Sequence, residues 1–217
     1  MSLPTETSGN ELATSTSSRR RPPPRPGTST PERLKEAAII EFAGRGFHAT
    51  TTRDIAARAG LSPAGVYVHF PSKEDLLFAI CQDGHTAALE MLRDAAADSA
   101  SPTEALRTTL GTFAQWHAER YEDARVVQYE FPHLSHPHRE DILSIRKAIN
   151  QVVADILAEG DRAGEFDVDD IPATTLAILS MAADVCRWYD TDIRRSPESI
   201  GTDYGELAVR LVRSRTS

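Results

Sequence analysis

The 217-residue sequence predicts an all-α protein, in which a three-helix N-terminal unit with a helix-turn-helix precedes a larger helical domain. Three observations support this fold class. After residue 30, apolar residues recur every three or four positions, and no stretch alternates as a half-buried strand does. Residues 52–70 hold two short helical patterns joined by a glycine-containing turn, which is typical of a helix-turn-helix. Prolines stand at or near the starts and joints of the later helical patterns.

The first helix is expected to begin at Thr30 and Pro31, where an N-cap residue precedes a proline at the first helical position. Leu34, Ala38 and Phe42 recur every four residues and form one apolar face. Two glycines, at positions 44 and 46, are expected to end this helix.

The helix-turn-helix is predicted from its capping residues. Threonine hydroxyls at positions 50–52 are expected to cap a short helix that Gly60 ends. Ser62 then caps a second short helix, which opens at Pro63 and runs to about Phe70.

The larger domain is predicted to be helical almost throughout. Approximate helices are expected at residues 73–97, 103–121, 123–131, 138–163, 170–190 and 197–213. Residues 171–189 are apolar nearly all round, with Asp184 and Arg187 as their only charges. Because a helix without a polar face must be covered on two sides, we expect a homodimer through the helices at 171–190 and 197–213.

Composition places the chain among ordinary globular proteins, with 40% hydrophobic and 26% charged residues. No run reaches the roughly 18 apolar residues of a membrane span, and the first 30 residues lack the apolar core of a secretory signal. We therefore expect a cytoplasmic protein that does not contact membranes. Its two cysteines, Cys81 and Cys186, lie in apolar helical patterns and are expected to be buried, reduced thiols.

The net charge of −8 hides a strong asymmetry. Residues 19–73 carry ten bases against four acids, whereas residues 74–217 carry 14 bases against 26 acids. A basic head on an acidic body suits a polyanionic partner for the head alone.

Three segments follow from these patterns: a disordered basic tail at 1–29, a helix-turn-helix domain at 30–76, and a larger domain at 77–217. The tail is rich in Ser, Thr, Pro and Gly, and too poor in bulky apolar residues to form a core. Its arginines at 19–21 and 25 suit an arm that lies along phosphates or enters a minor groove. An unpaired solubilising tail explains the same composition equally well.

The run from Phe42 to Leu76 resembles the DNA-binding domain of the TetR family of transcriptional regulators, and the similarity covers about residues 31–78 without a gap. Three linked features carry it: the glycine-phenylalanine end of the first helix, the threonine-capped second helix, and the Tyr-Val-His-Phe motif at 67–70. Together they are far more specific than a lone short motif.

The resemblance implies that Pro63–His69 is a recognition helix in the major groove, where small side chains let the backbone approach base edges. The residues expected to contact DNA are Thr52, Arg53, Ser62, Pro63, Ala64, Gly65, Tyr67, His69 and Lys73. Of these, Ser62, Ala64 and Gly65 are expected at bases, Thr52, Tyr67, His69 and Lys73 at phosphates, and Arg53 at a base or a phosphate. Val66 and Val68 depart from many relatives, so no relative's operator sequence can be transferred. Tyr67 is open to a second interpretation, in which it only packs the helices.

Residues 125–146 and 182–204 are similar to regulators of fatty-acid and sterol breakdown that respond to acyl-CoA thioesters. Such an effector requires an apolar tunnel and cations for its phosphates. The candidate pocket residues are Phe113, Trp116, Tyr129, Phe131, Met181 and Trp188, and the candidate cations are Arg125, Arg139, Arg146 and Arg187. Aromatic residues at helical spacing are, however, also the usual content of a core.

These features predict a ligand-responsive DNA-binding regulator, a repressor released from a palindromic operator by a small molecule. An all-α enzyme or binding protein acting on a lipid thioester is the alternative, although no nucleophile elbow or phosphate loop supports it. Non-specific DNA compaction is disfavoured by the acidic body. His133, His136 and His138 invite a metal site, but prolines place them on an irregular connection, so no metal or cofactor is expected.

Overall fold

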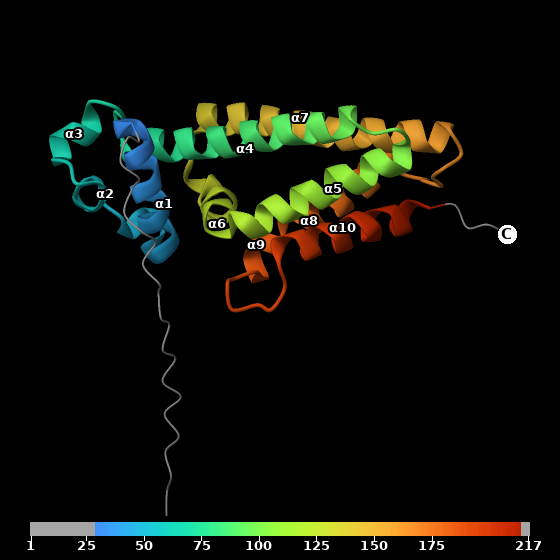
Figure 1. Cartoon of the computed structure of the whole chain (residues 1–217). Coiled ribbons are helices and arrows are strands. Elements are labelled where there is room, and N and C mark those ends of the chain that lie inside the picture. The colour runs from blue at the N-terminus through green and yellow to red at the C-terminus, as the bar shows by residue number, and fades with distance from the viewer. Residues whose placement is uncertain (1–28, 214–217) are drawn as a thin grey trace, which may run out of the picture.

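The computed structural model describes residues 29–213, and within them it confirms the all-α fold (Figure 1). The predicted tail, apart from Ser29, lies outside the described residues. The N-terminal unit comprises α1 (Thr30–Ala49), α2 (Thr52–Ala59) and α3 (Pro63–Tyr67). The remaining elements are α4 (Lys73–Ala97), α5 (Pro102–Glu119), α6 (Tyr121–Tyr129), the 3₁₀ turn η1 (Phe131–His133), α7 (His136–Arg162), α8 (Ile171–Ala183), α9 (Val185–Trp188) and α10 (Pro197–Val212). Between residues 29 and 213, no helix is long and apolar enough to cross a membrane.

Helix α1 differs from the prediction at both ends. Its N-cap is Ser29, whose hydroxyl accepts from the amide of Glu32, so the expected cap, Thr30, is the first helical residue instead. The glycines do interrupt the helix as expected, because Gly46 is non-helical with φ of 78°, and a further turn then runs to Ala49. Thr50 stabilises this last turn, because its hydroxyl contacts the carbonyl oxygens of Glu41 at 3.1 Å and Gly46 at 2.9 Å.

The two short helices of the helix-turn-helix form as the capping residues predict. Thr51 and Asp54 make a reciprocal capping box at the start of α2, and Ser62 caps α3 through the amide of Gly65. Helix α3 ends at Tyr67, earlier than expected, because Phe70 precedes a proline and is biased away from helical conformation.

Helix α4 crosses the boundary that we expected after residue 76 and joins the two units (Figure 1). Near its start, Leu76 and Leu77 are fully buried in the core of the N-terminal unit. Near its end, Leu89 and Leu92 belong to the core of the larger domain. The N-terminal core also receives side chains from α6, η1 and α7, so the two units share packed surface as well as this helix.

Two predicted helices are interrupted in the larger domain. The helix expected at 170–190 breaks at Asp184, where a short-range bond from the amide of Arg187 to its carbonyl oxygen (2.9 Å) tightens the chain into α9. The helix expected at 123–131 ends at Tyr129, and the proline at position 132 lies in η1.

Helices α5 and α10 pack more extensively than any other pair of described elements, and they approach closely through glycines. A Cβ atom on Gly205 would lie 2.5 Å from the carbonyl oxygen of Arg107, and one on Gly111 would lie 2.9 Å from that of Gly201. Only residues without a side chain allow the two backbones to come this close.

Two histidines are among the buried polar residues of the larger domain. His85 and His117 are 6% and 3% exposed, and each ring Nδ1 lies beside the carbonyl four residues earlier, at 2.7 Å from Cys81 and 2.8 Å from Phe113. Burial lowers the pKa of both imidazoles to about 4, so both are neutral at pH 7.

We expect Gly205→Ala to destabilise the protein by about 1–3 kcal/mol, because the new methyl group meets backbone that cannot move aside. Urea denaturation followed by circular dichroism measures the change. Gly44→Ala is the matched control, since a Cβ atom there meets nothing within 4 Å. Equal stabilities of the two variants would contradict the close approach of α5 and α10.

The buried histidines predict a loss of stability on mild acidification. The pKa of an unperturbed imidazole is about 6.5, whereas that of His117 in the folded protein is about 4. Between these two pH values the unfolded chain binds a proton at this residue and the folded protein does not. Stability is therefore fully present above pH 6.5 and is lost as pH falls toward 4, by about 1 kcal/mol for this residue between pH 7 and 5.5. His117→Gln is expected to remove that part of the loss in urea titrations at both pH values. Exposed His136→Gln is the control, and an identical pH dependence in all three proteins would refute the assignment.

Candidate nucleic-acid interface

Helix α3 lies at the end of the molecule formed by the N-terminal unit (Figure 1), and it presents small or apolar side chains outward. Pro63 and Ala64 are exposed, whereas Val66 is fully buried and fixes the helix against its neighbours. Tyr67 and Val68 are 54% and 78% exposed. This surface lets backbone approach another molecule closely, as the sequence predicted for a recognition helix.

The hydroxyl groups of Thr52 and Tyr67 lie 3.1 Å apart and join the start of α2 to the end of α3. Tyr67 therefore both packs the two helices and keeps a polar group at the surface, where it has capacity for a second hydrogen bond. Arg53 and His69 are exposed close to this pair in sequence. Two helices thus bring their polar ends to one side of the unit, a suitable arrangement for phosphate contacts.

Lys73, also expected at a phosphate, is engaged inside the protein. Its Nζ atom donates to the carbonyl oxygens of Thr50 at 2.7 Å and Phe47 at 2.5 Å, and it lies 4.2 Å from the centre of the Phe47 ring. Burial lowers the pKa of this ammonium group. One of its three protons remains for an external acceptor, so phosphate contact by Lys73 stays a prediction.

A buried acid organises the N-terminal unit, and sequence analysis missed it. Glu41 is 5% exposed and pairs with Arg58 of α2 and with Arg45 of its own helix. Burial alone would raise its pKa, but hydrogen bonds from Arg58 and Arg45 outweigh it and lower the pKa. The available signal was an acid beside Phe42 on the inner face of α1, with an arginine four residues later. The Glu41–Arg58 pair thereby ties α2 to α1.

The short turn η1 contacts the N-terminal unit directly. The ring of His133 stacks on Phe47, with centroids 5.3 Å apart, and meets the ring of His48 edge-on at 4.3 Å. Glu130 lies 3.3 Å from His133 and completes the contact. No feature of the sequence pattern predicts this contact between the two units.

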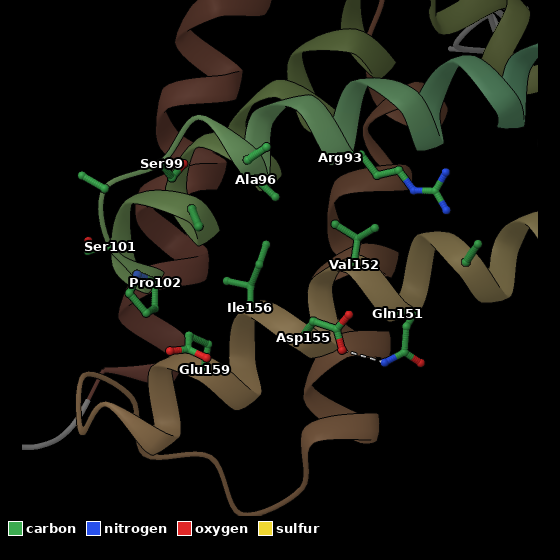
Figure 2. A pocket seen from close by; sticks show the side chains of 14 residues that line it. Arg93, Ala96, Ser99, Ser101, Pro102, Gln151, Val152, Asp155, Ile156 and Glu159 are labelled. Atoms are coloured by element: carbon green, nitrogen blue, oxygen red, sulfur yellow. Dashed lines mark hydrogen bonds between the residues drawn. The ribbon is translucent and has the colours of Figure 1, made fainter.

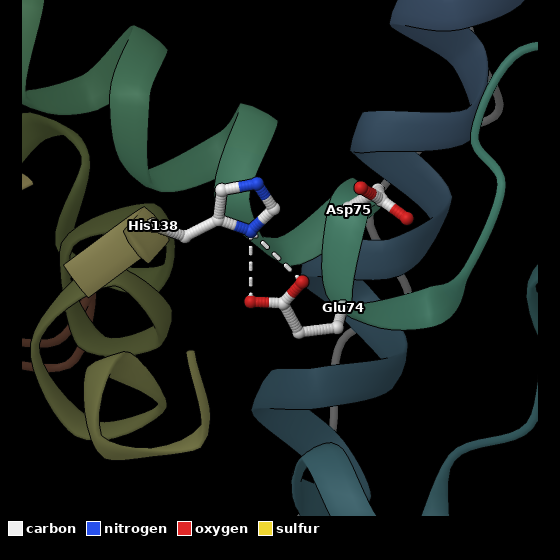
Figure 3. A group of neighbouring side chains, drawn as sticks. All are labelled: Glu74, Asp75 and His138. Atoms are coloured by element: carbon white, nitrogen blue, oxygen red, sulfur yellow. Dashed lines mark hydrogen bonds and ion pairs between the residues drawn. The ribbon is translucent and has the colours of Figure 1, made fainter. Parts of the chain in front are cut away.

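A second polar contact joins α4 to the start of α7 (Figure 3). His138 Nδ1 lies 2.9 Å from both carboxylate oxygens of Glu74, and the amide of Ser135 donates to the same group at 2.6 Å. Asp75 is near enough to share a metal ion with this pair. Its carboxylate, however, already accepts from the Ser72 hydroxyl, and Glu74 and His138 satisfy each other. The three histidines considered in the sequence do not converge, since His133 and His138 have these separate partners.

A groove of about 740 Å³ lies at the far end of the larger domain, between the α4–α5 connection and α7 (Figure 2). It is lined by Arg93, Ala96, Ala97, Ser99, Ala100, Ser101, Pro102, Ala105, Ala148, Gln151, Val152, Asp155, Ile156 and Glu159. None of the six predicted pocket residues lines it. Phe113 is buried in the core, Tyr129 is exposed, and Trp116, Phe131, Met181 and Trp188 are half-buried. Their role in ligand binding stays a prediction.

Three of the four candidate cations bind carbonyl oxygens or a carboxylate of the protein. Arg125 donates to the carbonyl oxygens of Cys186 at 2.6 Å and Tyr189 at 2.8 Å, which ties α6 to α9. Arg139 donates to two carbonyl oxygens of the η1 region. Arg187 makes two hydrogen bonds with Asp184. Arg146 is bonded differently, as described below.

Two family models match the chain. Residues 34–80 match the model described as "Bacterial regulatory proteins, tetR family", and residues 99–212 match that described as "Tetracyclin repressor-like, C-terminal domain". The second match alone covers more than half of the chain.

Whole-chain comparisons agree. The HTH-type transcriptional repressor KstR2 of Mycolicibacterium smegmatis is 33% identical over 194 residues, which are 87% of this chain and 92% of the relative. The fatty acid metabolism regulator protein of Bacillus subtilis is 26% identical over 131 residues, covering 60% of this chain and 68% of the relative. A crystal structure of a tetR-family regulatory protein from Rhodococcus RHA1 matches with a TM-score of 0.82 and 38% identity, covering 87% of this chain and 100% of that one. The chain therefore belongs to the TetR family of bacterial transcriptional regulators.

Proposed function

We propose that this protein is a homodimeric repressor that binds a palindromic operator and leaves it when a small molecule binds to the larger domain. The carrying observation is the outward surface of α3, where Ala64 and Gly65 leave the backbone close to the surface beside the Thr52–Tyr67 hydroxyl pair. A helix whose backbone can approach DNA closely is suited to contact base edges, and hydroxyl groups are suited to hydrogen-bond with phosphates. The repressor KstR2, similar over nearly its whole length, supports the same function.

Exposed leucines on α8 and α10 support the homodimer. Leu176 is 61% exposed, and Leu207 and Leu211 are 41% and 63% exposed. Alanines at 173 and 177 are also exposed on α8. If α8 and α10 of one copy pack against α8 and α10 of a second copy, this apolar surface is covered and the two copies are related by two-fold symmetry. Two recognition helices related in this way require a palindromic site.

We infer that the effector is an acyl-CoA thioester. The support is the similarity to a fatty acid metabolism regulator and the apolar and aromatic content of the larger domain, including Phe113, Trp116, Met181 and Trp188. Because α4 belongs to both cores and η1 contacts both units, a rearrangement in the larger domain changes the position of the recognition helix. Operator occupancy then depends on the ligand. Such a regulator acts in the cytoplasm, where its operator lies.

The proposal is tested with the full chain and the DNA upstream of its own gene, against random duplex at matched salt. Selective binding that one acyl-CoA relieves supports the proposal, whereas equal affinity for all duplexes contradicts it. Turnover of the thioester by the purified protein would favour the enzymatic alternative.

Tyr67→Phe is expected to weaken operator binding about tenfold, because one hydrogen bond to a charged phosphate is lost while the packing of α2 and α3 remains. Fluorescence anisotropy with labelled operator measures the affinity. Tyr129→Phe, which removes an exposed hydroxyl of α6, is the control. A Tyr67→Phe protein with wild-type affinity would show that the tyrosine serves packing alone.

Leu176→Glu is expected to convert the dimer to monomers, because each copy places a charge in the proposed α8–α10 interface. Analytical ultracentrifugation measures the mass, and operator affinity should fall with it. Leu143→Glu, on α7 and also exposed, is the control that keeps the dimer. A dimer that persists in Leu176→Glu places the interface elsewhere.

A further inference from the structure

We propose that Arg146 is the anion-binding residue of the larger domain, and that it takes the carboxylate or phosphate group of an apolar effector. This inference rests on the proposed ligand-responsive function. It assigns the effector's charged group to one residue on α7 and connects that residue to the N-terminal unit through η1.

Arg146 differs from the other candidate cations because neither of its terminal nitrogens has a close acceptor among residues 29–213. Its Nε atom donates to Nε2 of His85 at 2.9 Å, and Nη2 makes a long contact of 3.4 Å with Gln128. The guanidinium carbon lies 4.1 Å from the centre of the Phe131 ring. Among residues 29–213, no carboxylate forms an ion pair with Arg146, although its side chain is half-buried and burial lowers its pKa.

The neighbouring titratable groups do not supply the missing negative charge. Burial raises the pKa of the Cys81 thiol to about 12 and lowers that of His85 to about 4, so both are neutral at pH 7. A desolvated charge without a counter-charge costs stability, and proteins ordinarily pair it. Arg125 and Arg139 place Nη2 on carbonyl oxygens, and Arg187 pairs with the carboxylate of Asp184.

His85 holds Arg146 in a conformation that leaves donors free. The Nδ1 atom of His85 lies 2.7 Å from the carbonyl oxygen of Cys81, so this nitrogen carries the proton and Nε2 accepts from Arg146. In the described part of the chain Nη1 of Arg146 has no hydrogen-bond partner, and Nη2 has only the long contact with Gln128. Two adjacent guanidinium nitrogens are the donor pair that matches a planar carboxylate or two phosphate oxygens.

The same arginine touches the element that contacts the N-terminal unit. Phe131, under the guanidinium, is the first residue of η1, and His133, the last residue of η1, stacks on Phe47. An anion that draws the guanidinium away from Phe131 removes a cation–π contact from this turn. Effector binding and the position of the helix-turn-helix are thereby linked through three residues of one turn.

The decisive variant is Arg146→Gln. The glutamine amide nitrogen occupies the place of arginine Nε in the side chain, so it can still donate to His85, whereas the charge and both Nη groups are lost. Arg162→Gln, at the exposed end of the same helix, is the matched control, because its surface ion pair with Glu159 contributes little. The probes are octanoyl-CoA and octanoate, which carry the same chain with a phosphate-bearing or a carboxylate group.

We expect at least one probe to raise the Tm of the wild-type protein and of Arg162→Gln, and to release operator DNA from both. Arg146→Gln should need at least tenfold more of the same probe, since a charged hydrogen-bonding group is worth more than about 1.4 kcal/mol. A response to octanoate identifies a carboxylate, and a response to octanoyl-CoA alone identifies a phosphate. Equal responses of Arg146→Gln and wild type, or no wild-type response to either probe, would overturn the inference.

The Tm without ligand separates a binding role from a structural one. Without ligand, the cost of burying this unpaired charge opposes its cation–π contact with Phe131, so the Tm of Arg146→Gln should stay within about 2 °C of wild type or rise. A fall of more than about 4 °C would show that Arg146 holds the fold and would refute its assignment. Selective operator binding by the wild-type protein, measured in the same series, tests the proposed function independently.

Discussion

The continuity of α4 through two hydrophobic cores is the constraint on which the rest of the structure depends. Leu76 and Leu77 are packed in the N-terminal core, and Leu89 and Leu92 are packed in the core of the larger domain. Close-packed interiors resist gradual deformation. A movement of α4 in the larger domain therefore also involves the leucines that it packs into the N-terminal core.

The contacts beside α4 differ in character from the cores. Glu74 with His138, and His133 with Phe47, are polar and aromatic contacts between partly exposed groups. Such contacts are directional and individually weak, so they can be exchanged at lower cost than buried leucine packing. Within the N-terminal unit the opposite holds, because buried Glu41 ties α2 to α1 through Arg58. This unit is held by buried contacts, and the joint behind it includes partly exposed side chains.

The sequence pattern identified the local determinants of the helix-turn-helix more fully than the contacts that its charged residues make inside the protein. Capping residues and the outward small residues of α3 follow from neighbours close in the chain, and these were predictable. Lys73 was expected to face outward, but its ammonium group turns toward carbonyl oxygens at the end of α1. Such a contact joins residues more than 20 positions apart, and neither periodicity nor spacing encodes that distance.

By itself, the sequence determined the helical fold class, the helix-turn-helix, the family and the apolar excess of the helices near the C-terminus. These properties arise from short-range periodicity, capping and composition, which a linear pattern contains. Tertiary structure alone decided that α4 is shared by two cores, that η1 touches the N-terminal unit, and which arginines are satisfied internally. The same residue type is a structural clamp with several carbonyl partners at Arg125 and has a single close hydrogen bond at Arg146. Only packing distinguishes the two, because burial and hydrogen-bond partners are set by segments distant in sequence.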